Sequence, residues 1–99
     1  MANVWTHGTW TVKPGSEDAF VEAWLTLVRD VSGVIAPPTP PTLLRDRERS
    51  NVFVSFGPWP DDAAVARFRS SEAFRDGQAR MHDLLESFVP QTLDEVSAG

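Results

Sequence analysis

Hydrophobic and polar residues alternate with a period of two at the start of the chain, which predicts a strand over Val4–Val12. One face of this strand carries Trp5 and the other carries Trp10, so we expect both faces to be covered. After Ser16 the apolar positions repeat about every 3.6 residues, which predicts a helix that ends near Gly33. Its predicted buried stripe consists of Phe20, Ala23, Trp24, Leu27, Val28 and Val31.

A proline-rich connector at 36–41 separates this helix from the rest of the chain. It can form neither a helix nor a central strand, because proline lacks the amide proton that both structures use. Alternation then resumes and predicts two strands, 42–47 and 51–57. The segment between them is short enough for an antiparallel hairpin.

Two helices are predicted next, a short one capped by Asp61 or Asp62 and a longer one capped by Ser70 or Ser71. Pro90 is expected to end the longer helix. Apolar positions at helical spacing predict the buried residues of the pair, which are Ala64, Val65, Phe68, Phe74, Gly77 or Gln78, Met81, Leu84 or Leu85, and Phe88.

With a closing strand at 91–96, the element order becomes strand, helix, strand, strand, helix pair, strand. This order is typical of a ferredoxin-like βαββαβ fold of the α+β class, in which helices cover one face of an antiparallel sheet. We expect one domain over residues 1–99. The second sheet face would remain uncovered, and a second subunit on that face would give a homodimer.

Composition narrows the possible partners. The net charge of -5 opposes binding to nucleic acid, which needs clustered basic residues to release counterions. No apolar run approaches the ~20 residues that cross a bilayer, and no export signal is visible at Met1. The chain has no cysteine, so we expect a cytoplasmic protein without thiolate chemistry.

Three side chains are candidates for chemistry from their own properties. Trp59 lies where a strand turns into a helix, and it could stack on an aromatic ligand or simply plug the end of the sheet. His82 lies at the border of an apolar helix stripe and could serve as a base or lie at the surface. His7 shares a strand face with Trp5 and could line either a cavity or the dimer interface. Two histidines this far apart predict no metal site.

Several short segments together resemble the antibiotic biosynthesis monooxygenase family. They are Trp10–Gly15 before a helix carrying Phe20, Leu43–Arg45, Val52–Trp59 leading into a capped helix, and Ser70–Phe74. The resemblance spans residues 4–96 and implies a dimeric α+β barrel with a cavity between sheet and helices in each protomer. Characterised members oxidise polycyclic aromatic or quinol substrates with molecular oxygen and no cofactor, or degrade haem. Other members have no known activity.

The resemblance carries over few functional residues. Haem-degrading members use an asparagine, a tryptophan and a histidine at positions that hold Gly8, Phe68 and Gln78 here, which disfavours haem degradation. Aromatic-polyketide monooxygenases have a tryptophan at the end of the third strand, which Trp59 matches. Their other polar positions fall near Ser55, Val65 and Gln78, where the residue types differ, so only Trp59 is carried over.

The resulting hypothesis is a monooxygenase without cofactor or metal that oxidises a small aromatic or quinol-type substrate. The pocket wall is expected to come from Trp59, Trp5 or Phe56, and the polar group that holds or removes a proton is expected among His7, Ser55, Gln78 and His82. Two alternatives remain, a non-catalytic dimer that binds a small hydrophobic molecule or another partner, and an isomerase or cyclase on the same barrel.

Overall fold

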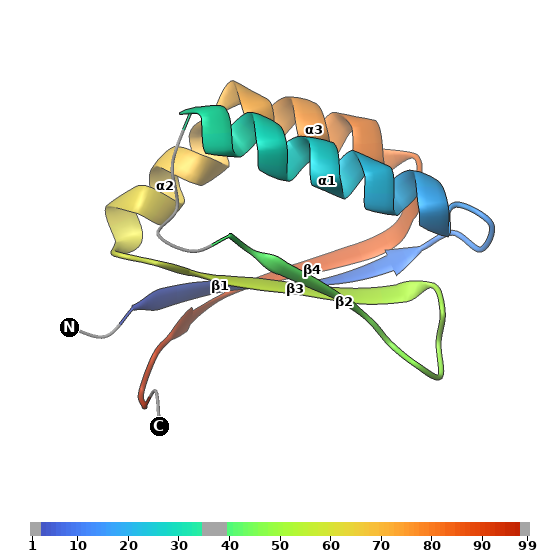
Figure 1. The fold of residues 1–99 in the computed structure, drawn as a ribbon, viewed down its shortest axis with the longest axis horizontal. Helices are drawn as coiled ribbons and strands as arrows, with labels where there is room; N and C mark the ends of the chain where they lie inside the picture. The colour runs from blue at the N-terminus through green and yellow to red at the C-terminus, as the bar shows by residue number, and fades with distance from the viewer. Residues whose placement is uncertain (1–2, 35–39, 98–99) are drawn as a thin grey trace.

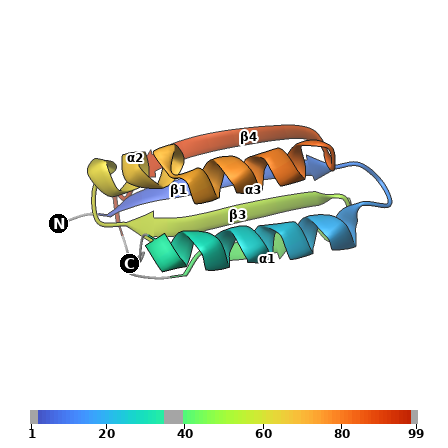
Figure 2. The ribbon, with the colours of Figure 1, turned by 90° about the horizontal axis from the view of Figure 1, so that it is seen from above.

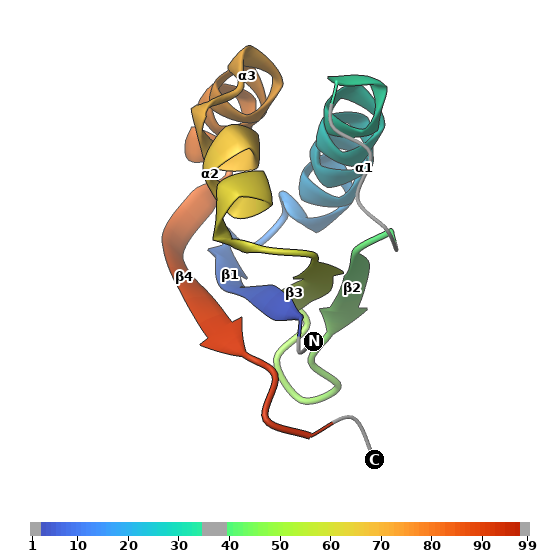
Figure 3. The same cartoon turned by 90° about the vertical axis from the view of Figure 1, so that its left-hand side faces the viewer.

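The computed structural model describes residues 3–34 and 40–97, so most of the predicted proline-rich connector lies outside the described residues. Four strands form one antiparallel sheet in the order β2-β3-β1-β4, and three helices cover one face of it (Figures 1 and 3). The elements are β1 (Val4–Val12), α1 (Glu17–Val34), β2 (Thr42–Arg45), β3 (Val52–Trp59), α2 (Asp62–Ser70), α3 (Glu72–His82) and β4 (Leu85–Asp94). The predicted α+β class and ferredoxin-like arrangement are confirmed.

Strand β1 lies at the centre of the sheet and has the predicted bounds. It pairs with β3 on one side and with β4 on the other, so that Trp10 lies opposite both Phe53 and Phe88. Gly8 lies opposite Ser55 and Pro90 in the same register. Because paired residues of antiparallel strands share a sheet face, these side chains gather on the face that the helices cover.

The predicted end of the long helix is wrong. Helix α3 ends at His82, and β4 begins at Leu85 and runs through Pro90, which had been expected to stop a helix. The apolar residues after His82, such as Leu85, Phe88 and Val89, are spaced as on a helix face, so their spacing misled the prediction. Pro90 is compatible with β4 because this strand forms an edge of the sheet, where alternate amides make no ladder hydrogen bond.

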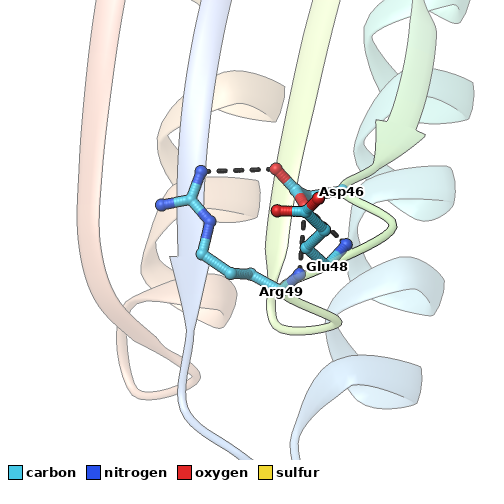
Figure 4. A network of polar contacts seen from close by, with 3 residues as sticks. All are labelled: Asp46, Glu48 and Arg49. Carbon is cyan, nitrogen blue, oxygen red and sulfur yellow. Dashed lines mark hydrogen bonds and ion pairs between the residues drawn. The ribbon is translucent and has the colours of Figure 1, made fainter.

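Two strand bounds also differ from the prediction. β2 ends at Arg45 because Asp46 turns the chain: its Oδ1 accepts backbone N–H bonds from Glu48 at 2.8 Å and Arg49 at 3.0 Å (Figure 4). These bonds, together with the Arg49 side chain, hold the pKa of the Asp46 carboxyl below its usual range. β3 continues past Gly57 to Trp59, so Gly57 and Pro58 belong to the strand.

The main core lies between the sheet and α1 with α3. Its buried residues are Trp10, Val12, Phe20, Trp24, Leu27, Val31, Phe53 and Met81, which confirms most of the predicted α1 stripe. The helices α1 and α3 lie side by side above the sheet (Figure 2). Their contact depends on Gly77, where an added Cβ would lie 2.5 Å from Leu27 Cδ1. The glycine costs about 1 kcal/mol in helix propensity, and this close packing offsets the cost.

The other sheet face carries no helix (Figure 3). Apolar side chains on this face include Leu44 on β2, Val89 and Leu93 on β4, and these three are exposed by 51%, 55% and 44%. Among the described residues, no helix is long and apolar enough to cross a membrane.

Candidate active site

The indole of Trp10 is the centre of the candidate site between sheet and helices. Its Nε1–H donates a hydrogen bond to Ser55 Oγ at 2.9 Å, across the β1–β3 pair. Its ring stacks on Phe88 from β4, with the ring centroids 3.8 Å apart and the planes 19° apart. The three strands therefore fix both the position and the plane of an aromatic surface that is 4% exposed.

Gly8 makes room for this arrangement. A Cβ added at Gly8 would lie 2.8 Å from Phe88 Cε1 and 3.1 Å from both Ser55 Oγ and Trp10 Nε1. Real Cβ atoms do not approach other atoms as closely as the first of these distances, so an alanine would push the Phe88 ring aside. A glycine inside a strand often marks such a close approach.

Two hollows border the stacked Trp10 and Phe88 rings. The larger, of about 110 Å³, is bordered by Trp10, Gln78, Met81, His82, Leu85 and Phe88. The smaller, of about 60 Å³, is bordered chiefly by Gly8, Ser55, Phe68, Arg69, Phe74 and Pro90. Both hollows also touch Trp10, so the indole forms a wall that they share.

The polar side chains of the larger hollow come from α3. Gln78 is half-buried, and His82, one turn later, is exposed at the end of the helix. The remaining border is apolar or aromatic. An amide and an imidazole at the rim of an apolar hollow can bind the hydroxyl groups of a ring and exchange a proton with water.

Trp59 lies apart from these hollows. It is 6% exposed, its Nε1–H donates to Thr6 Oγ1 at 3.0 Å, and it stacks on Phe68 with centroids 5.0 Å apart. The hollow that it borders, together with residues of α1, has a volume of only about 40 Å³. Trp10 is packed and paired in the same way, so the small volume of the adjoining hollow is what distinguishes Trp59 as a core indole that closes the end of the sheet.

Three further predicted site residues face the open side of the sheet. Trp5 and Phe56 lie with ring centroids 6.3 Å apart, and Trp5 Nε1 donates to Glu95 Oε1 at 2.8 Å. Together with His7 they border a broad hollow of about 740 Å³ that also touches the C-terminal segment 93–97. His7 Nδ1 is buried there without a hydrogen-bond partner, and His7 also borders the smaller hollow of the other face.

The structure thus brings Ser55, Gln78 and His82 together around Trp10, and it separates them from Trp5 and Phe56. Sequence reasoning missed Trp10 and Phe88 as site residues. The available signal was Gly8, two residues before Trp10 on the same strand face. The described residues contain no group of three His, Cys, Asp or Glu side chains that could hold a metal ion.

Comparison with known proteins identifies the family. The model of the antibiotic biosynthesis monooxygenase family matches residues 4–80, and the chain belongs to this family. No curated protein matches the chain. Among solved structures, PA3566 from Pseudomonas aeruginosa is 25% identical, with a TM-score of 0.82 and coverage of 98% of this chain and 97% of that one.

Two further solved structures share the fold at lower identity. SnoaB, a cofactor-independent oxygenase from Streptomyces nogalater, is 18% identical over 99% of this chain and 97% of its own, with a TM-score of 0.85. A protein from Caulobacter crescentus is 18% identical over 97% of this chain and 92% of its own, with a TM-score of 0.87.

Proposed function

We propose that this chain is a cofactor-independent monooxygenase that oxidises a small quinol-type aromatic with molecular oxygen in the site around Trp10. The observation that carries the proposal is the larger hollow, where the Trp10 and Phe88 rings form the wall and Gln78 and His82 supply the polar rim. Family membership and the shared fold with SnoaB, a cofactor-independent oxygenase, support the reaction class.

The volume of the site favours a small substrate. An apolar cavity of roughly 150 Å³ accepts benzene, and the larger hollow measures about 110 Å³. Phe88 borders both hollows and is half-buried on an edge strand. Turning this ring outward joins the two hollows and leaves the Trp10 face free to stack on a ring of the substrate.

The chemistry needs a deprotonated phenol in a dry pocket. His82 takes the phenolic proton and passes it to water, while the Gln78 amide holds a second oxygen of the substrate. The phenolate then gives one electron to O2, and the resulting phenoxyl radical and superoxide combine to form a C–O bond. The resulting peroxide anion takes up a proton from water, and loss of water from the hydroperoxide leaves a new carbonyl. Overall, hydroquinone and O2 give hydroxybenzoquinone and water, and the substrate supplies every electron.

We further propose that two copies of the chain pair through the open sheet face. The exposed apolar side chains on that face support a covered face. A chain of 99 residues buries little area per residue, so it gains more stability from a second subunit than a larger domain would.

Two matched tryptophans provide the test. Oxygen uptake is measured with metal-stripped protein and with hydroquinone, catechol, a naphthohydroquinone and anthrone, after subtraction of uptake with heat-denatured protein. We expect uptake, lowered by up to about tenfold in Trp10→Phe because the stack with the substrate ring weakens by ~0.5–1.5 kcal/mol. Trp59→Phe is the control, because Trp59 is equally buried and also donates to a hydroxyl and stacks on a phenylalanine.

An equal loss of uptake in both variants would indicate that Trp59 also forms part of the wall of the substrate pocket. No uptake with any substrate would contradict the oxygenase proposal. The remaining functions would then be a dimer that binds a small hydrophobic molecule, or an isomerase or cyclase that needs the pocket but no oxygen.

A further inference from the structure

Arg69 places a positive charge beside the smaller hollow. It lies in the last turn of α2, and its Nη2 donates to Thr92 Oγ1 on β4 at 2.7 Å. This bond holds the guanidinium between helix and strand at the edge of the site. The ion pairs within the described residues join Arg49 to Asp46 and Arg80 to Asp30, so Arg69 has no carboxylate partner there.

A second donor borders the same hollow. The Ser55 oxygen accepts the Trp10 N–H, which leaves the hydroxyl proton of Ser55 available for another acceptor. The hollow measures about 60 Å³, and this volume suits a group as small as a carboxylate. A guanidinium and a hydroxyl around such a space are donors that a carboxylate accepts well.

We propose that the substrate is an aromatic acid whose carboxylate binds Arg69 and Ser55 in the smaller hollow. The inference rests on the proposed function for the position of the ring. Both hollows border the stacked Trp10 and Phe88 rings, with His82 at the larger one and Arg69 at the smaller one. A substrate ring that replaces Phe88 against Trp10 would extend a hydroxyl toward His82 and its carboxylate toward Arg69.

The overall negative charge of the protein limits the proposed attraction for a carboxylate to short range. With a net charge of -5, the chain repels anions at a distance, so a preference for an acid must come from direct pairing in the site. Arg69 is exposed enough for salt to screen part of the attraction, and we expect the preference for the acid to fall as salt concentration rises.

The test compares two ligands that differ only in the carboxylate, catechol and 3,4-dihydroxybenzoate. Binding is measured by calorimetry without oxygen, so that no turnover occurs. We expect wild-type protein to bind the acid about tenfold more tightly than catechol. Arg69→Gln should abolish that preference and leave catechol affinity unchanged. Arg67→Gln, on the same turn of α2 but on no hollow described above, should retain the preference.

The inference fails if wild-type protein shows no preference, if Arg69→Gln keeps it, or if Arg69→Gln weakens catechol binding equally. Oxygen uptake with the same two ligands separates this inference from the proposed function. A binding preference that depends on Arg69, without any uptake, would overturn the oxygenase proposal and support the acid site.

Discussion

Replacing His82 with alanine should lower the rate constant kcat for oxygen uptake by about 10²- to 10⁴-fold, the usual contribution of a positioned acid or base. His82 borders the larger hollow and is exposed at the end of α3, so its removal leaves no cavity in the core. Substitution of an exposed side chain such as this one usually changes the free energy of unfolding by only about 0.5 kcal/mol. The measurement is steady-state oxygen uptake with the best quinol substrate, together with a urea unfolding curve.

The control is His7→Ala, which removes the other histidine of the chain; His7 borders the smaller hollow and the open face but not the larger hollow of His82. Added imidazole should restore part of the rate to His82→Ala, because the small base can enter the space that the side chain leaves. An unchanged kcat in His82→Ala, or an equal loss in His7→Ala, would remove His82 from the role of base.

Leu44→Asp should convert the proposed dimer into a monomer. Leu44 lies on the open face of β2, and the two-fold symmetry of the dimer would bury two carboxylates in one apolar interface. Burying unpaired charges costs several kcal/mol, so we expect the dissociation constant to rise at least about 100-fold. Light scattering during size-exclusion chromatography over a dilution series measures the change.

Leu25→Asp is the matched control, because Leu25 on α1 and Leu44 are both 51% exposed. This variant should remain dimeric. A wild-type protein that is monomeric throughout the dilution series, or a Leu44→Asp variant that dimerises normally, would show that the open face is not the interface.

The sequence predicted most elements because local signals agreed with the final fold. The alternation in Val4–Val12 and the stripe of α1 each match a buried face, and Asp61 and Ser71 cap the helices at predicted positions. The prediction failed after His82, where the apolar residues keep the spacing of a helix although the backbone forms a strand. Only pairing with β1, a contact distant in sequence, makes Leu85–Asp94 a strand.

The site was harder to predict because its members meet only through the sheet register. Trp10, Ser55 and Phe88 come from three different strands. The sequence around each residue does not indicate that the three side chains are in contact. Trp59 was favoured because it lies at a strand end, yet the hollow that it borders is smaller than the one beside Trp10. Sequence spacing cannot distinguish two indoles that differ only in what faces them across the sheet.

The most direct test of the account is the fate of oxygen during turnover. Metal-stripped protein is supplied with hydroquinone and oxygen-18 gas, and the products are analysed by mass spectrometry. The account predicts one labelled atom in the hydroxylated quinone and the other in water. A quinone without label, or no oxidised product above the uncatalysed background, would contradict the claim that this chain is a monooxygenase.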